Sequence, residues 1–334
     1  MKNLILLSTT LLLVLFANAQ IVNIPDANFK AALVNHIPVI DTNYDGEIQV
    51  SEAETFNGQI FVSNKNISDL TGIEYFINIT SLNCSDNQLD TLYLSNNTLL
   101  THLYCLYNQI DTIDVSSNVA LIELYCEGNQ LSSLDVSNNT VLSYLDIINN
   151  QIDTLDLSNN TSLTGLNCAM NLLDTLDLSN NTLLTGLSCG LNYISGLDLT
   201  NNISLTYLYC SNNQLISLKV KNGNNSNFIN FNANYNPNLF CIEVDDPNWS
   251  TVNWTNIDPQ SFFSSNCSVV QPIVYIPDTN FKAYLIGNSS INTNMDAEIQ
   301  VSEASYFTGT IEVNNKNISE LTGIEFFTSI NALF

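Results

Sequence analysis

The sequence contains no arginine: its 7 basic residues are all lysines, set against 32 aspartates and glutamates. The formal net charge of −25 leaves no basic face, and a nucleic-acid binder needs one to contact the phosphate backbone. The composition therefore excludes nucleic acid as a partner. The same acidity favours the attraction of cations to the surface.

Catalytic combinations of side chains are also missing. The chain has 2 histidines, His36 and His102, and neither stands at an interpretable spacing from a serine or cysteine nucleophile. We find no glycine-rich loop of the kind that cradles phosphate. The sequence therefore predicts a protein that is not an enzyme.

Long apolar runs are confined to the N-terminus. Residues 1–19 contain Lys2, a leucine-rich run from Leu4 to Phe16, and a final Ala17-Asn18-Ala19. This order is typical of a secretory signal peptide, and the run is too short to span a bilayer. We expect a secreted or cell-surface protein, without a transmembrane segment, whose mature chain begins at Gln20.

What the sequence does contain is a 21-residue repeat, seen clearly from Leu166 to Gly186. The Leu-x-Cys alternation in each repeat predicts a short strand with one face buried. An asparagine follows each strand, and its amide can bond the buried backbone groups of a turn. These asparagines are Asn87, Asn108, Asn129, Asn150, Asn171, Asn192 and Asn213. A second asparagine series in the same repeats is Asn97, Asn118, Asn139, Asn160, Asn181 and Asn202.

The pattern L-x-x-L-x-C-x-x-N-x-L resembles the leucine-rich repeat family, over roughly residues 60–240. Its doubled motif resembles the secreted bacterial class with nested 21-residue periodicity. The resemblance implies a leucine-rich repeat solenoid with short parallel strands, little helix and small helical EF-hand-like caps. We place the N-terminal cap at residues 20–75, the repeats at 76–240, the C-terminal cap at 241–267 and a linker at 268–272.

Eight cysteines fall into two groups. Six occupy the same interior position of the repeat, where they act as small apolar residues and stack in poor geometry for bridging. Cys241 and Cys267 lie outside this register and flank Trp249 and Trp254. We interpret this pair as a disulfide that closes the C-terminal cap, and we expect the tryptophans to cover the last open coil.

The N-terminal cap contains a twelve-residue loop from Asp41 to Glu52 that resembles an EF-hand calcium loop. Oxygen ligands stand at positions 1, 3, 5 and 12, with glycine at position 6. The expected Ca²⁺ ligands are Asp41, Asn43, Asp45, the backbone of Glu47, and Glu52. The alternative is a turn that binds nothing. The cap as a whole resembles the caps of internalin-type repeat proteins.

Residues 273–334 repeat the first cap, and we interpret them as the start of a second, truncated repeat domain. The second loop has lost the charge at position 1 and the glycine at position 6, so we expect it to bind Ca²⁺ more weakly. Its candidate ligands are Asn292, Asn294, Asp296, Glu298 and Glu303.

Outward side chains on the Leu-x-Cys strands form the predicted binding face. They are His102, Tyr104, Glu123, Tyr125, Tyr144, Tyr207 and Tyr209. Tyrosines on a rigid array offer a large contact area at little entropic cost, although aromatic residues also simply suit strands. A second outward series carries aspartates from Asp114 to Asp198, whose repulsion we expect turn hydrogen bonds and solvent to offset.

The sequence thus predicts a monomeric, non-enzymatic protein that binds a protein or glycan through its strand face, in adhesion or cell-surface interaction. A recognition module of a larger secreted enzyme, with its catalytic part beyond residue 334, is the alternative. A structural spacer is the third possibility, and a uniformly polar strand face would support it.

Overall fold

The computed structural model describes residues 20–267, 273–293, 295 and 297–334. The expected signal peptide at 1–19 and linker at 268–272 lie outside the described residues. The chain divides into two compact units, residues 1–139 and 140–334. We describe each unit by itself.

The first unit begins with a small helical cap. Helix α1 (Ala27–Val34) starts at Asp26, whose carboxylate accepts hydrogen bonds from the N–H groups of Asn28 and Phe29. Helix α2 (Val50–Thr55) starts with a bond of 3.0 Å from the Gln49 N–H to the Glu52 carboxylate. The predicted loop from Asp41 to Glu52 follows α1 and ends within the first turn of α2.

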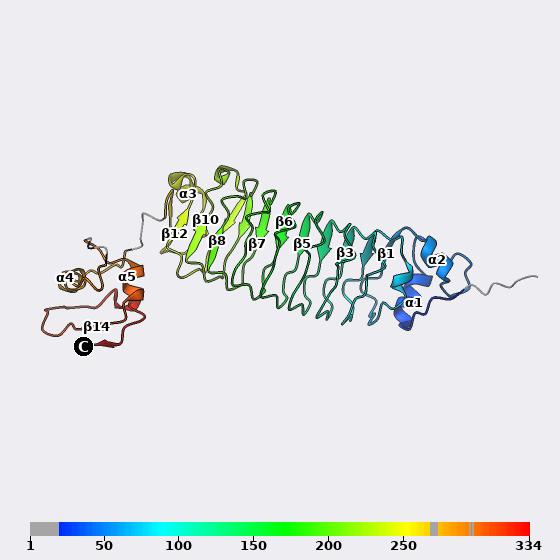
Figure 1. Cartoon of the computed structure of the whole chain (residues 1–334), viewed down its shortest axis with the longest axis horizontal. Coiled ribbons are helices and arrows are strands. Elements are labelled where there is room, and N and C mark those ends of the chain that lie inside the picture. Colours follow the sequence, from blue (N-terminus) through cyan, green and yellow to red (C-terminus); the bar gives the residue numbers. More distant parts are fainter. Residues whose placement is uncertain (1–19, 268–272, 294, 296) are drawn as a thin grey trace, which may run out of the picture. The chain divides into compact units, whose positions relative to one another are not determined.

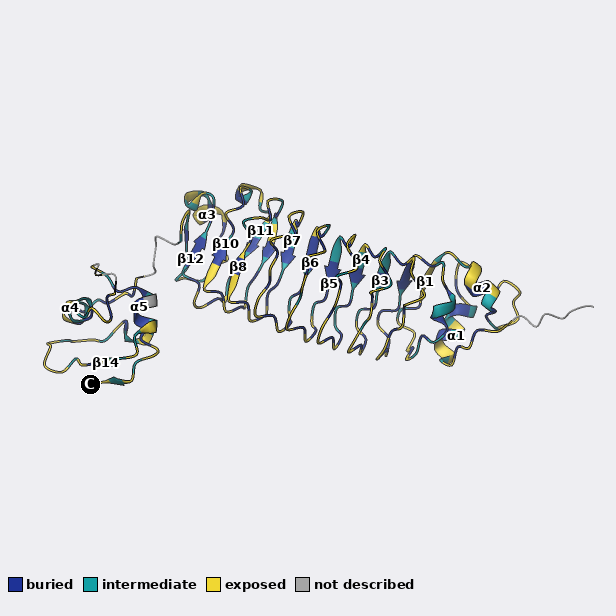
Figure 2. Cartoon of the chain, viewed as in Figure 1, coloured by how far each residue is buried: buried dark blue, intermediate teal, exposed yellow. Residues whose placement is uncertain are grey.

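Short parallel strands follow the cap as successive coils of the chain (Figure 1). They are β1 (Gln59–Phe61), β2 (Ser81–Asn83), β3 (His102–Tyr104) and β4 (Glu123–Tyr125), with the 3₁₀ turn η1 (Ile73–Tyr75) between β1 and β2. Their central residues Ile60, Leu82, Leu103 and Leu124 lie side by side in register and are completely buried. The inward residues of the strands therefore form one continuous buried row (Figure 2), and residues of the turns, such as Cys84 and Leu89, extend the core.

The second unit has the same kind of short parallel strand, one in each coil; these strands are called rungs below. They are β5 (Tyr144–Asp146), β6 (Gly165–Asn167), β7 (Gly186–Ser188), β9 (Tyr207–Tyr209) and β11 (Asn230–Asn232). Each strand pairs in parallel with the next at its leucine or phenylalanine. The step from Tyr207 to Asn230 is longer than the 21-residue repeat because extra residues are inserted near Gly223, and the turn η2 (Asn225–Asn227) accommodates them. The register is thus restored after the insertion.

A second parallel sheet forms in this unit from β8 (Gly196–Asp198), β10 (Ser217–Lys219), β12 (Cys241–Glu243) and β13 (Phe262–Ser264). The coil geometry therefore extends past residue 240, into the segment expected as a cap. Asn236 continues the first asparagine series beyond Asn213: it accepts from the Leu215 N–H and donates to the Cys210 carbonyl.

An aromatic cluster covers the last rungs. Trp254 follows helix α3 (Pro247–Asn253), is almost fully buried, and stacks on Phe231 with ring centroids 4.1 Å apart and planes 4° apart. Phe263 of β13 packs against the edge of the same indole. Trp254 thus closes the open coil as the sequence predicts, while Trp249 packs edge-on against Trp254.

Residues 273–334 fold as a second cap like the first, with α4 (Thr279–Ile286), α5 (Val301–Tyr306), β14 (Thr310–Ile311), η3 (Ile324–Phe326) and β15 (Ala332–Leu333). Asp278 caps α4 as Asp26 caps α1, and its second oxygen accepts from Ser319 as that of Asp26 does from Ser68. Phe281 and Leu285 are buried in its core, in the positions of Phe29 and Leu33.

The two asparagine series are buried and bonded differently. Asn108, of the first series, accepts from the Leu89 N–H at 3.0 Å and donates to the Cys84 and Cys105 carbonyls. Asn118, of the second series, donates to the Leu94 and Asn97 carbonyls, but its Oδ1 has no partner among the described residues. Asparagines of both series donate hydrogen bonds to backbone carbonyls of the preceding coil. Among the described residues, only those of the first series also accept a hydrogen bond from a backbone N–H.

Candidate binding face

The binding face consists of the outward residues of the rungs. In β3 and β4 the central leucine is buried while the residue on either side of it is half-buried. This pattern follows from strand geometry, in which successive side chains point to opposite faces. The outward residues of neighbouring rungs therefore stand side by side in two rows.

In the first unit these rows bring four predicted residues together: His102, Tyr104, Glu123 and Tyr125. The Tyr104 and Tyr125 rings stack with centroids 4.9 Å apart, and the His102 ring lies parallel to Tyr104 at 6.4 Å. The Tyr104 hydroxyl donates to Glu123 Oε2 at 3.1 Å. Burial and the neighbouring Glu123 carboxylate raise the pKa of Tyr104 above its ordinary value.

In the second unit the predicted residues are Tyr144, Tyr207 and Tyr209. The rings of Tyr207 and Tyr209 are tilted by 30° with centroids 5.1 Å apart, and burial raises the pKa of Tyr207. Tyr144 lies across Gly165 of the next rung: a Cβ built on Gly165 would be 2.6 Å from Tyr144 Cδ2. The sequence interpretation missed this pairing, although the 21-residue spacing of Tyr144 and Gly165 was the signal for it.

The aspartate series takes hydrogen bonds from its own turns. Asp114, Asp135 and Asp177 each accept from the serine N–H two residues on, at 2.9 Å. Hydrogen bonds from the hydroxyl and from the N–H group of that serine hold the pKa of each of the three carboxyls below its ordinary value. Asp198 makes the same kind of bond to Thr200 and also pairs with Lys219 at 2.9 Å. Turn bonding accounts for this acidic series without a bound cation.

The loop from Asp41 to Glu52 is closed by bonds to its own amides. Asp41 accepts from the N–H groups of Asp45 and Gly46, and Asp45 accepts from that of Glu47. Glu52 accepts from Thr42 and from Gln49. These oxygens are of the type that Ca²⁺ prefers, but Glu52 is directed at loop and helix amides in this conformation. The side chain of Glu47 pairs with Lys30.

The second loop repeats these contacts where it is described. Glu303 accepts from the Thr293 N–H at 2.7 Å and from the Gln300 N–H at 3.0 Å, and Glu298 pairs with Lys282. Asn292 is buried. Asn294 and Asp296 lie outside the described residues. Within the described ranges, no three histidine, cysteine, aspartate or glutamate side chains are grouped so that they could hold a metal ion.

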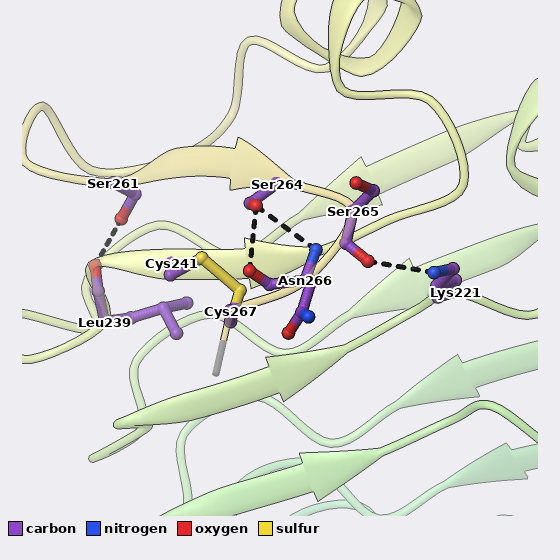
Figure 3. The surroundings of a disulfide bond; sticks show 8 residues. All are labelled: Lys221, Leu239, Cys241, Ser261, Ser264, Ser265, Asn266 and Cys267. Carbon is purple, nitrogen blue, oxygen red and sulfur yellow. Dashed lines mark hydrogen bonds between the residues drawn. A yellow bond between two sulfur atoms is a disulfide. The ribbon is translucent and has the colours of Figure 1, made fainter. Parts of the chain in front are cut away.

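Cys241 and Cys267 form a disulfide, which joins the residues that follow β13 to the start of β12 (Figure 3). Around it, the Ser261 hydroxyl donates to the Leu239 carbonyl at 2.6 Å, and Lys221 Nζ donates to the Ser265 carbonyl at 2.9 Å. The other six cysteines form no disulfide and are buried in the interior: Cys84, Cys105, Cys126, Cys168, Cys189 and Cys210. In the part of the chain described, no helix is long and apolar enough to cross a membrane.

Comparison with known proteins finds relatives among solved structures alone, since no protein-family model and no curated protein matches the chain. The functional domain of InlJ from Listeria monocytogenes, which includes a cysteine ladder, is 31% identical, with a TM-score of 0.53 over 67% of this chain. Our chain spans only 56% of that domain.

Two further matches are more distant. Internalin C2 from Listeria monocytogenes is 23% identical over 66% of this chain and 93% of its own, with a TM-score of 0.49. A leucine-rich repeat protein of Leptospira interrogans is 21% identical over 59% of this chain and 51% of its own, with a TM-score of 0.44. Together with the repeating parallel rungs, the InlJ match shows that the chain has the leucine-rich repeat fold of the bacterial internalins.

Proposed function

We propose that this protein is a secreted or cell-surface, non-enzymatic leucine-rich repeat protein that binds another macromolecule through its strand face. The aromatic cluster of the first unit supports this most strongly. His102, Tyr104 and Tyr125 present stacked rings on rigid rungs, and such pre-ordered aromatic groups lose little entropy on binding. A spacer would not need them.

Secretion and adhesion are part of the same proposal. The disulfide between Cys241 and Cys267 suits an oxidising compartment, and the InlJ domain shows that the fold occurs in internalins. We also infer that the chain is a monomer, which light scattering would test directly. A recognition module of a larger enzyme remains the alternative; hydrolase assays on the product of the full reading frame would distinguish the two.

The binding proposal is tested with the whole mature chain on immobilised fibronectin, laminin and collagen and on cell surfaces. The variant Tyr104→Ala/Tyr125→Ala removes the stacked pair, and we expect it to weaken capture roughly tenfold or more. Tyr93→Ala is the matched control, because Tyr93 is exposed but lies outside these two rows. Equal capture of both variants and the parent would argue for a spacer.

Calcium at the first loop is a separate proposal. The oxygen atoms of Asp41, Asn43, Asp45 and Glu52 and the Glu47 carbonyl would hold the ion, and it would stabilise the cap electrostatically. Asp41 and Glu52 are both buried, at 3% and 8% exposure, so their charges gain most from a cation. The ion would have to compete with the amide bonds that Glu52 makes to Thr42 and Gln49.

A further inference from the structure

The outward row of the second unit is interrupted by two adjacent glycines. Tyr144 pairs with Gly165, Gly165 with Gly186, and Gly186 with Tyr207, all in parallel register. The two tyrosines are therefore three strand steps apart, about 14 Å at roughly 4.8 Å per step. Between them the sheet has no outward side chain in this row.

The backbone does not require these glycines. Neither Gly165 nor Gly186 adopts a left-handed conformation. Glycine inside a strand is less favourable than alanine by about 0.5–1 kcal/mol. A glycine in such a place often marks a position where a ligand or another backbone comes close. The two glycines thus need an explanation other than turn geometry.

The outward surface at Gly165 and Gly186, between Tyr144 and Tyr207, is called the floor below, and the two glycines have different surroundings in it. The Tyr144 ring rests on Gly165, where an added Cβ would be 2.6 Å from Cδ2 and 2.7 Å from Cε2. Above Gly186 the space is open, because an added Cβ would meet no atom within 4 Å. An aromatic ring lying on the sheet therefore borders an open patch of backbone, with Tyr207 on its other side.

Polar groups line the second row beside this floor. Asp146, Asn167 and Ser188 stand in register there. Asn167 Nδ2 donates to Asp146 Oδ2 at 3.3 Å, while Asn167 Oδ1 is buried and has no hydrogen-bond partner among the described residues. The row carries one acidic and no basic side chain, so it does not suit an anionic ligand.

We propose that this floor binds a neutral glycan, with a sugar ring over Gly186 between Tyr144 and Tyr207. A pyranose has an apolar C–H face, which suits an aromatic ring, and an edge of hydroxyl groups, which suits amide, hydroxyl and carboxylate partners. The second N–H of Asn167 Nδ2 and the Ser188 hydroxyl would bind the sugar hydroxyls. The inference rests on the proposed strand-face recognition and names its ligand class for the second unit.

An extended peptide fits this floor less well. Peptides that recognise a sheet usually add to its edge and bond to free backbone groups. At this floor the backbone groups pair within the sheet: the Gly186 N–H donates to the Thr164 carbonyl, and the Cys189 N–H donates to the Tyr209 carbonyl. Only side chains and the glycine surface face outward, which favours a ligand bound by stacking and hydroxyl contacts.

The test uses the whole mature chain in native gels that contain soluble xylan, mannan, mixed-linkage β-glucan or galactan. We expect at least one of the four to retard the parent. Gly186→Val fills the floor and should weaken that retardation roughly tenfold. Gly196→Val is the matched control, because a Cβ at Gly196 also meets nothing within 4 Å but Gly196 lies in the other sheet. The Gly196→Val variant should be retarded by the polysaccharide as strongly as the parent.

A second pair of variants guards against misfolding of Gly186→Val. Tyr144→Ala removes the ring and should lose binding, whereas Tyr144→Phe keeps the ring and should retain most of it; melting temperatures monitor the fold. The inference is overturned if none of the four polysaccharides retards the parent, or if Gly186→Val and Tyr144→Ala are retarded like the parent. Capture of a protein ligand that depends on Tyr104 and Tyr125 but not on Gly186 would leave strand-face recognition standing without the glycan.

Discussion

The phenol of Tyr104 donates a 3.1 Å hydrogen bond to the carboxylate of Glu123, which lies diagonally across on the next strand, opposite His102. Both burial and this carboxylate favour the protonated phenol, so the pKa of Tyr104 lies above its ordinary value. This pair links two coils through their outward side chains and gives the proposed face a titratable reporter.

We predict that Glu123→Gln lowers the pKa of Tyr104 toward its ordinary value, because the neutral amide no longer repels the phenolate. Ultraviolet absorbance titration measures the shift, with Tyr104→Phe identifying the tyrosine that titrates. The folded chain holds this proton more tightly than the unfolded chain. Its stabilising contribution is therefore complete below the unfolded pKa and is lost as the pH rises through the folded pKa. An unchanged titration in Glu123→Gln would contradict the assignment.

The two asparagine series should differ in their cost of removal. Asn192 accepts from the Leu173 N–H and donates to the Cys168 and Cys189 carbonyls. Asn181 donates to the Leu157 and Asn160 carbonyls. Because each group left unsatisfied costs about 1–3 kcal/mol, Asn192→Leu should lower the free energy of unfolding more than Asn181→Leu. Urea unfolding of both variants measures the difference, and equal losses would refute it.

The six interior thiols should be unreactive in the folded chain. Burial raises the pKa of Cys84, Cys168 and Cys189 well above the ordinary value and that of Cys210 to about 12. We expect no labelling by a thiol reagent at mildly alkaline pH. After denaturation without reductant, labelling should modify six cysteines and spare Cys241 and Cys267. Peptide mapping that finds Cys105 joined to Cys126 would disprove the prediction that the interior cysteines form no disulfide.

Calcium should raise the melting temperature of the mature chain, and a chelator should reverse the effect. At free calcium tenfold above Kd, mass action adds about 1.4 kcal/mol to the stability of the folded state. Asp41→Ala and Glu52→Ala should abolish most of this gain, whereas Asn292→Ala in the second cap should change it little.

Calorimetric titration at millimolar calcium supplies the decisive measurement, since extracellular sites often have Kd near 10⁻⁴–10⁻³ M. Absence of heat and of any thermal shift would leave the Asp41–Glu52 loop as a turn held by its own amide bonds.

The fold could be predicted from the sequence because the same pattern of buried and turn residues recurs in every 21-residue repeat. A single Leu-x-Cys alternation is a weak signal, but its recurrence from Leu82 to Leu208 fixes the strands, the core and the asparagine positions together. Where the period is broken, prediction failed. The insertion near Gly223 hid the return of the register at Asn230 and the role of Asn236 in the first series.

The candidate site was only partly predictable. The outward tyrosines follow from strand alternation, so their rows could be assigned from the sequence. Which rings stack depends on side-chain torsions that periodicity does not fix: Tyr104 stacks on Tyr125, whereas Tyr144 lies over Gly165. The direction of the Glu52 carboxylate is likewise a choice among rotamers, which a ligand pattern alone does not specify.

The ladder bonds have a direction along the chain. Asn108 and Asn192 bond to groups of their own coil and of the coil before, and Asn87 finds the Val62 carbonyl in the N-terminal cap. Each coil therefore meets its asparagine partners in chain that has already been made. The backbone depends on the opposite direction, because, among the described residues, the Leu89 N–H of one coil is satisfied only by Asn108 of the next. Each added coil therefore completes the hydrogen bonds of the coil before it.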